Sequence, residues 1–329
     1  MQQKMANVLT AVFSAATAIT AVSAAATAAD MKVVVTLKPV HALVSQIMAG
    51  IATPALIVDG SASPHTFTLK PSGAKAINEA DVFIRISESV EPFTRKISQA
   101  LPKTVQLLTL AELPGMTLLE QRHSGSFEEH ADHQDEHQGK DKAGAHHDDH
   151  DEAESQAKDG HVWLNPDNAK AIVTSVTKVL AQTYPADADK LNANAATLLT
   201  KIDVLSAEIA AQLEPVKGKP FIVFHDSMQY FEQRFGLSAA GSITVSPDVQ
   251  PSAKRLTEVR KKIIELGAAC VFSEPGFQPK LVAAVTDGTK ARSGVIDAEG
   301  IALTPGPELY FDLMRGLARS LKGCLQPTS

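Results

Sequence analysis

Cysteine is scarce in this chain, which has only Cys270 and Cys324 among its 329 residues. Their wide separation excludes a metal or redox site of the CxxC type. In an exported chain an even pair of cysteines is first interpreted as a disulfide. Such a bond would close a loop of about 55 residues and stabilise the fold by roughly 4 kcal/mol in the chain-entropy model. Two buried free thiols remain the alternative on these observations.

Long apolar runs are also missing, because after the first 29 residues no segment reaches the roughly 18 apolar residues of a transmembrane helix. The first 29 residues contain Lys4, an apolar stretch rich in Ala, Val and Thr, and the cleavage-type sequence Ala26-Thr27-Ala28. This pattern predicts a signal peptide over residues 1–29 and a periplasmic mature protein. An uncleaved membrane anchor is disfavoured because the stretch is only weakly apolar. No cysteine follows it, so we expect no bacterial-type lipid anchor.

The chain has no basic excess, and its acidity is concentrated in one segment. Residues 124–159 contain three lysines and twelve acidic residues, a net charge of −9, whereas the whole chain carries −6. The remainder therefore sums to about +3, which gives no support to nucleic-acid binding. A segment this polar cannot bury enough apolar surface to fold, so we expect residues 124–159 to be disordered.

The acidic segment also holds six of the eleven histidines. A flexible chain cannot form one preorganised tetrahedral site, but it can form several weak, exchanging metal sites. One hypothesis is that the segment gathers metal ions for a site elsewhere in the fold, and the alternative is a dispensable tract that binds metal incidentally. The candidate auxiliary ligands are His130, His133, His137, His146, His147 and His150.

Elsewhere, short apolar strands alternate with helical patterns, which predicts an α/β fold with parallel sheets. The predicted strands are 33–37, 55–58, 82–87, 105–108, 221–224, 241–244, 270–273 and 294–296. The predicted helices are 40–49, 70–79, 91–100, 167–183, 227–235, 252–266, 279–287 and 308–322.

Residues 186–213 predict one further, much longer helix. Apolar residues from Leu191 to Leu213 recur at steps of three, four and seven, which places them on one helical face. At 1.5 Å per residue the helix would run roughly 40 Å, long enough to lie along two lobes. We therefore predict an N-terminal lobe (30–123 and 160–185), the acidic loop (124–159), a linking helix (186–213) and a C-terminal lobe (214–329).

Outside the acidic segment and His123, four histidines remain, of which two lie where an α/β sheet would bind a ligand and a third lies at a loop re-entry. His65 follows a predicted strand, His225 ends one, and His161 lies where the acidic segment rejoins the fold. Ligands of open α/β sheets bind beyond the carboxyl ends of the strands. His41 is interpreted as a residue of a helix start. Asp226 and Ser227 are more consistent with helix N-caps than with ligands.

Five segments carry a resemblance to a known family: SPHTFTLKPSGAKAINEADVFIRI (63–86), GHVWLNP (160–166), FIVFHDSMQYFEQRFGL (221–237), PDVQPSAKRL (247–256) and CVFSEPGFQP (270–279). They resemble the ZnuA-type zinc-binding proteins, within the metal-binding cluster of substrate-binding proteins that serve ABC transporters. The resemblance covers the mature chain, and the acidic histidine-rich insertion is typical of zinc members of the family. It implies two lobes joined by a rigid helix, with the metal bound in the cleft between them, and a disulfide in the C-terminal lobe that would join Cys270 and Cys324.

The resemblance implies that His65, His161 and His225 are the metal ligands. Manganese members carry a carboxylate at the third position, so His225 favours zinc, in agreement with the preference of Zn²⁺ for imidazole. Some zinc members have a glutamate immediately before the first histidine, where this chain has Pro64. The fourth ligand is therefore expected to be a water molecule or Asp297, which alternatively caps a turn or orients a histidine.

The expected function is that of a monomeric, non-enzymatic component that captures Zn²⁺ and delivers it to an ABC permease in the inner membrane. Zinc is then the transported ligand, and histidine ligation predicts that affinity falls as the pH drops through about 6.5. A three-histidine zinc hydrolase is the first alternative, although the sequence has no HExxH or GxSxG motif. A metal-dependent adhesin is the second, and it lacks support from adhesion repeats.

Overall fold

The structure is a computed structural model that describes residues 31–122, 157–244, 246–247, 249–277 and 279–326. The predicted signal peptide, His123 and the six histidines of the acidic segment lie outside these residues. Lys158 and Asp159, at the end of that segment, lie within them.

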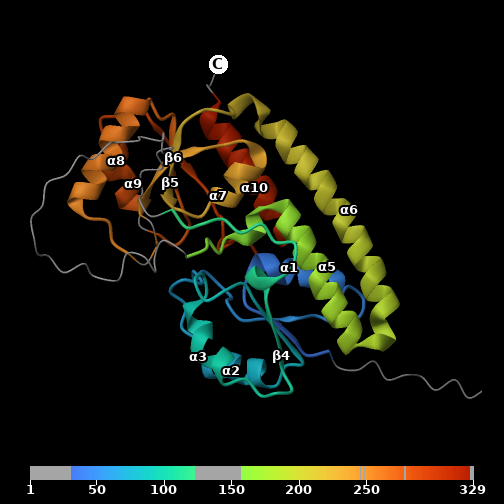
Figure 1. Cartoon of the computed structure of the whole chain (residues 1–329). Coiled ribbons are helices and arrows are strands. Elements are labelled where there is room, and N and C mark those ends of the chain that lie inside the picture. The colour runs from blue at the N-terminus through green and yellow to red at the C-terminus, as the bar shows by residue number, and fades with distance from the viewer. Residues whose placement is uncertain (1–30, 123–156, 245, 248, 278, 327–329) are drawn as a thin grey trace, which may run out of the picture.

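Eight strands form two parallel sheets of four strands each (Figure 1). The strand orders are β2-β1-β3-β4 and β6-β5-β7-β8, so both sheets share one topology in which the first strand of each lobe is internal. This confirms the predicted α/β class. The strands are β1 (Val33–Val35), β2 (Ala55–Leu56), β3 (Val82–Arg85), β4 (Gln106–Thr109), β5 (Phe221–His225), β6 (Ala239–Thr244), β7 (Cys270–Ser273) and β8 (Arg292–Val295).

Continuous apolar runs make the inner strands buried on both faces, as parallel sheets covered by helices require. Helices pack on the sheets, and one hydrophobic core cluster includes residues of both lobes. The helices are α1 (Lys38–Ile47), α2 (Pro71–Asn78), α3 (Arg95–Gln99), α5 (Pro166–Thr183), α6 (Ala188–Leu213), α7 (Gln229–Phe235), α8 (Ala253–Leu266), α9 (Pro279–Thr286) and α10 (Leu309–Leu325), with 3-10 turns η1 (Pro92–Thr94), η2 (Leu110–Glu112), η3 (Val162–Leu164), η4 (Pro185–Asp187) and η5 (Glu214–Val216).

The 26 residues of α6 make it the longest helix of the described chain, about 39 Å at 1.5 Å per residue. It contacts α1 and α5 at the N-terminal lobe and α10 at the C-terminal lobe, and Figure 1 shows it running along one side of both. Its predicted apolar face, from Leu191 to Leu213, is buried. The predicted arrangement of two lobes joined by a long helix is confirmed.

Three local expectations differ from the structure. The helix predicted over 91–100 is a 3-10 turn followed by the short α3, and α10 continues three residues beyond Lys322. Neither Asp226 nor Ser227 caps a helix, because α7 begins only at Gln229 and has no side-chain cap. Asp226 instead forms an ion pair with Arg122.

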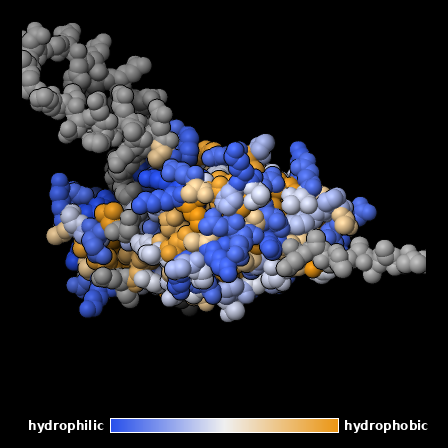
Figure 2. Space-filling model, turned by 90° about the horizontal axis from the view of Figure 1, so that it is seen from below, coloured by the Kyte–Doolittle hydropathy of each residue, from blue (hydrophilic) through white to orange (hydrophobic). Residues whose placement is uncertain are grey.

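Among the described helices, none has both the length and the apolar character of a membrane span. The face seen in Figure 2 is largely hydrophilic, with apolar residues grouped nearer its centre.

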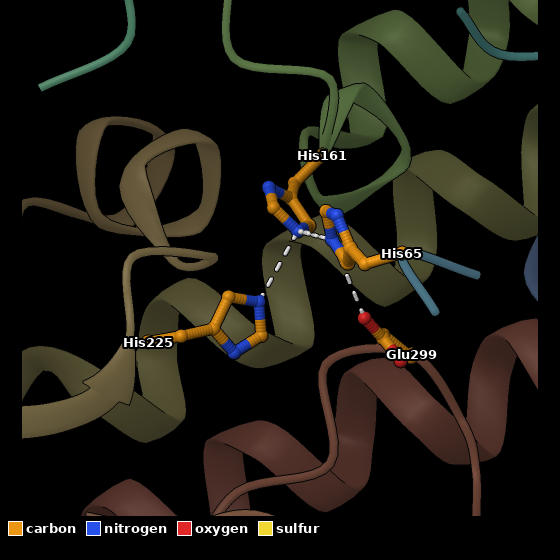
Figure 3. Close-up of side chains that lie close together, drawn as sticks. All are labelled: His65, His161, His225 and Glu299. Atoms are coloured by element: carbon orange, nitrogen blue, oxygen red, sulfur yellow. Dashed lines mark hydrogen bonds and ion pairs between the residues drawn. The ribbon is translucent and has the colours of Figure 1, made fainter. Parts of the chain in front are cut away.

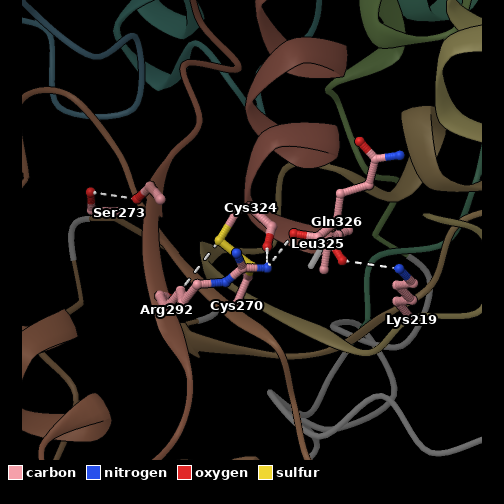
Figure 4. The surroundings of a disulfide bond; sticks show 8 residues. Lys219, Cys270, Ser273, Arg292, Cys324, Leu325 and Gln326 are labelled. Carbon is pink, nitrogen blue, oxygen red and sulfur yellow. Dashed lines mark hydrogen bonds between the residues drawn. A yellow bond between two sulfur atoms is a disulfide. The ribbon is translucent and has the colours of Figure 1, made fainter. Parts of the chain in front are cut away.

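A disulfide joins Cys270, the first residue of β7, to Cys324 in the last turn of α10. Figure 4 shows that cationic side chains reach the same end of α10. Arg292 donates to the carbonyls of Cys324 and Gln326, and Lys219 donates to that of Leu325 at 3.1 Å. Cations at a helix C-terminus satisfy carbonyls that lack helical partners. The disulfide and these bonds fasten α10 to the sheet of the C-terminal lobe.

We predict that Cys270→Ala/Cys324→Ala lowers the free energy of unfolding by about 4 kcal/mol, because the disulfide closes a loop with a sequence separation of 54. Urea unfolding of the metal-free variant and the oxidised wild type measures the difference. Affinity for the metal expected between the lobes should change little, since both cysteines lie at the opposite end of β7 from the site described below. An unchanged urea midpoint would contradict the prediction.

Candidate metal centre

Three histidines from distant parts of the sequence lie side by side between the lobes (Figure 3). His65 lies in the loop between β2 and α2, His225 is the last residue of β5, and His161 directly precedes η3. The carboxyl ends of parallel strands meet at one edge of each sheet, which brings the loops of the two lobes together here. All three side chains are at most 11% exposed.

The Nε2 atoms of the three rings point toward a common centre. Nε2 of His161 lies 3.3 Å from Nε2 of His65 and 3.4 Å from Nε2 of His225. A fourth potential ligand, Oε1 of Glu299, lies 3.6 Å from Nε2 of His65. The four ligand atoms lie within 4.8 Å of one another, and they form the one such group among the described residues.

Two of the rings are held by carboxylates through the nitrogen that faces away from this centre. Nδ1 of His161 lies 2.7 Å from Oδ1 of Asp159, and Nδ1 of His225 lies 2.7 Å from Oε2 of Glu274. The same carboxylates accept the backbone N–H groups of the histidines that they hold. A carboxylate at Nδ1 keeps the proton on that nitrogen, which leaves the Nε2 lone pair free for a metal.

The carboxylate beside the histidines belongs to Glu299, whereas Asp297, expected as a ligand or as a turn cap, closes a turn. The Asp297 carboxylate turns back on its own loop and accepts the backbone N–H groups of Ile301 and Ala302, at 2.8 and 2.9 Å. A short carboxylate side chain commonly closes a turn in this way. Glu299, two residues later, enters the cleft and is 4% exposed.

His41 is buried in α1, away from this group, and its Nε2 lies 2.9 Å from the carbonyl of Pro54.

Burial and charge act in opposite directions on the groups of the cluster. Burial, with the neighbouring imidazoles, lowers the pKa of His65 well below 6.5. Burial also disfavours the charged form of His225, but the adjacent Glu274 carboxylate outweighs it and raises the pKa to about 9. Burial raises the pKa of Glu299 to about 7. The metal-free cluster therefore holds protons near neutral pH that a cation would displace.

The backbone around His161 is fixed by the two ends of the acidic insertion. Glu120 and Lys158 form an antiparallel bridge, and Tyr230 donates to the carbonyl of Asp159 at 2.7 Å. Gly160 passes so close to Val90 that a Cβ atom would lie 2.2 Å from its side chain, so only glycine fits. The insertion thus joins the fold directly beside a candidate ligand.

Strand-end reasoning could have found more of the site than was predicted. Glu274 follows β7 and Glu299 lies in the loop after β8, so both occupy the edge that carries His225. Asp159 stands two residues before His161 in the sequence DGH. None of the three was expected as a partner or ligand, because each carboxylate taken alone is indistinguishable from a surface residue.

Two α/β lobes of identical topology, joined by one helix and enclosing a buried group of histidines and a carboxylate, define a metal-binding member of the solute-binding proteins. The family model described as "Zinc-uptake complex component A periplasmic" matches residues 33–324. The chain therefore belongs to the ZnuA family.

Named relatives agree with this assignment. The high-affinity zinc uptake system protein ZnuA of Brucella abortus is 44% identical over 316 residues, covering 89% of this chain and 91% of that protein. The protein of the same name from Yersinia pestis is 32% identical over 301 residues, covering 91% of this chain and 92% of that protein.

Solved structures share the fold. A crystal structure of ZnuA superposes with a TM-score of 0.71 at 22% identity, covering 90% of this chain and all of that chain. The Zn(II)-bound ZnuA-like domain of Streptococcus pneumoniae AdcA has a TM-score of 0.67 at 22% identity, covering 91% of this chain and all of that one. The laminin-binding adhesin Lmb of Streptococcus agalactiae, at 22% identity and a TM-score of 0.71, shares the same architecture.

We predict that Glu274→Gln lowers the pKa of His225 from about 9, because burial then acts against the positive charge with only Glu299 and Asp226 left to oppose it. NMR titration of the histidine ring protons in the metal-free protein measures this shift. Glu265→Gln, an exposed carboxylate on α8, is the matched control. A pKa for His225 that stays near 9 would show that Glu274 is not its cause.

Proposed function

We propose that this protein is a periplasmic zinc-capture component that binds one Zn²⁺ through His65, His161, His225 and Glu299 and delivers it to an ABC permease in the inner membrane. The zinc ion is cargo rather than a resident cofactor. Membership of a zinc-uptake family supports the class of function, and the geometry of the cluster supports the ligand set.

The observation that carries the proposal is the spacing of the four ligand atoms. A tetrahedral Zn²⁺ with ligands at 2.0–2.1 Å requires ligand atoms about 3.3–3.4 Å apart. Three of the six separations between ligand atoms, at 3.3, 3.4 and 3.6 Å, are close to that value, and all six are within 4.8 Å. Glu299 also has a buried oxygen, Oε2, that receives no hydrogen bond from the described residues. A buried carboxylate without full hydrogen bonding is costly unless a cation compensates it.

Zinc fits this group better than the harder divalent cations. Mg²⁺ and Ca²⁺ prefer six or more oxygen ligands, whereas three imidazoles and one carboxylate suit four-coordinate Zn²⁺. Asp159 and Glu274, which hold two of the rings, add negative charge around the ion.

A zinc hydrolase is the less favourable alternative. A catalytic zinc site keeps one coordination position for water or substrate, and in this cluster Glu299 lies at the fourth position. We therefore propose that the protein binds and releases zinc without turnover. The similarity to the adhesin Lmb gives the adhesin alternative no functional support, because at 22% identity it concerns only the fold.

The acidic insertion lies outside the described residues except at its ends, so its histidines remain candidates for weak auxiliary binding. The bridge between Glu120 and Lys158 places both ends of the insertion beside the site. We propose that ions gathered there reach the cleft over a short path. We also propose that the protein acts as a monomer, because each of the four candidate ligands comes from the same chain.

We predict that wild-type protein binds one zinc ion tightly and that His65→Ala, His161→Ala, His225→Ala and Glu299→Gln each weaken binding by about 100-fold or more. Competition with a chromophoric chelator measures the affinity, in protein whose residues 126–157 have been deleted to remove the auxiliary histidines. His41→Gln is the matched control, because His41 is a buried histidine outside the group. Retention of the tight site in any of the three histidine variants would overturn the proposed ligand set.

We predict that zinc binding releases more protons at pH 6 than at pH 8. His225, with its pKa of about 9, carries a proton to displace at both pH values, whereas Glu299, with its pKa of about 7, carries one at pH 6 and has mostly lost it at pH 8. The affinity therefore falls more steeply with decreasing pH below about 7 than above it. Calorimetry in buffers of different ionisation enthalpy counts the protons. Glu299→Gln should remove the step near pH 7, and an unchanged step would show that another group causes it.

A further inference from the structure

The loop that carries Glu299 belongs to the C-terminal lobe by sequence, since it follows β8, yet several of its hydrogen bonds run to segments outside that lobe. Nε1 of Trp163 donates to the carbonyl of Ala298 at 3.0 Å, and Oγ of Ser63 donates to Oε1 of Glu299 at 3.1 Å. Ser63 lies two residues before His65, and Trp163 lies two residues after His161. The position of the Glu299 carboxylate is thus set by the neighbours of two other candidate ligands.

The strongest of these links is Lys38, the first residue of α1 in the N-terminal lobe. Its Nζ donates to the carbonyls of Gly300, Ile301 and Leu303 at 3.3, 3.0 and 3.1 Å. An ammonium group has three N–H donors and no acceptor, so these three carbonyls match its full capacity. Lys38 is only 6% exposed, which is rare for lysine and requires such partners.

The same loop is braced from inside. The carboxylate of Asp297 accepts the backbone N–H groups of Ile301 and Ala302. The carbonyl of Ile301 is one of the three that accept from Lys38. Gly300 has a φ of +72°, and a Cβ atom there would lie 3.3 Å from the side chains of Leu309 and Leu313. A left-handed glycine therefore lets the chain turn directly after Glu299 and present its carbonyls to one ammonium group. The conformation of the loop thus directs three carbonyl groups to the Lys38 ammonium group.

We propose that Lys38 is a positioning residue for zinc capture, which holds the Glu299 carboxylate beside the three imidazoles across the boundary between the lobes. The proposal rests on the proposed function, in which Glu299 is a zinc ligand. Lys38 does not contact the ion. It acts on the backbone from Gly300 onward, and the loss of its three bonds would weaken the hold on the Glu299 carboxylate, which would keep its hydrogen bond from Ser63.

A purely structural role for Lys38, as one of several bonds between α1 and the C-terminal lobe, makes a different prediction. Gln46, also on α1, donates to the carbonyl of Pro307 at 2.7 Å, beyond the loop that Lys38 holds. Gln46→Met therefore removes a hydrogen bond between α1 and the C-terminal lobe but leaves the bonds from Lys38 to the Glu299 loop in place. It provides the matched control for loosening of the lobes.

The test measures zinc affinity for Lys38→Met in the wild-type, Glu299→Gln and His225→Ala backgrounds. Loss of a group that orients a ligand typically weakens metal binding 10–100-fold, and we expect this for Lys38→Met in the wild-type and His225→Ala backgrounds. In the Glu299→Gln background Lys38→Met should have no further effect, because the ligand that it positions is already lost. Gln46→Met should leave the affinity within about twofold of the wild type.

A second measurement reports coordination directly. Co²⁺ in place of Zn²⁺ gives visible absorption bands that depend on the ligand set, and the spectrum of Lys38→Met should shift toward that of Glu299→Gln. A wild-type spectrum would overturn the proposal. If Lys38→Met does not fold, Lys38→Gln, which retains two of the three donors, serves for both measurements, with a smaller loss of affinity.

The outcomes separate the two proposals. If Glu299→Gln alone leaves zinc affinity unchanged, Glu299 is not a ligand and the proposed ligand set fails. If Glu299→Gln weakens binding but Lys38→Met weakens it equally in the Glu299→Gln background, the ligand set stands and Lys38 acts by another route. Equal losses for Gln46→Met and Lys38→Met would likewise overturn the positioning role.

Discussion

The hydrogen bonds from carboxylates to imidazole Nδ1 atoms are the interaction on which the rest of the site depends. Asp159 and Glu274 fix the rings of His161 and His225 so that their Nε2 lone pairs face each other at 3.4 Å. Two facing lone pairs, or two facing N–H groups, repel in a buried environment. The arrangement is relieved when one proton or one metal ion lies between them, which explains why protons and zinc compete for the same space.

This local arrangement constrains the whole fold, because the four candidate ligands come from four separate segments between residues 65 and 299. Parallel sheets bring such segments together, since they direct the ends of successive strands and the loops that follow them to one edge. The two sheets have the same strand order, and α6 contacts helices of both lobes. The disulfide and the hydrogen bonds from Arg292 attach the C-terminal end of α10, the helix that follows the Glu299 loop, to the sheet of the C-terminal lobe.

The eight strands and the linking helix could be predicted because both depend on local patterns, namely short runs of three to six residues and one long apolar face. Two histidines could also be placed at strand ends, although the resemblance to a family was needed to treat them and His161 as a single site. The fourth group could not be assigned in this way. Asp297 and Glu299 stand in one loop, and only the turn that Asp297 closes on Ile301 and Ala302 shows which carboxylate enters the cleft. Asp226 was misjudged for a related reason, since its partner Arg122 lies 104 residues away.

Ligands drawn from both lobes have a thermodynamic consequence for delivery. In the proposed site, zinc bound by His65 of one lobe and His225 of the other would favour the closed arrangement by the free energy of the contacts that opening would break. By linkage, any partner that binds the open arrangement more tightly weakens zinc binding by the same factor, without touching the ion. A difference of about 4 kcal/mol in the partner's affinity for the two arrangements would weaken zinc binding nearly 1,000-fold. Tight capture and release at a permease are therefore compatible in one site, provided that the bonds between the lobes, including those of Lys38 to the Glu299 loop, are few enough to break together.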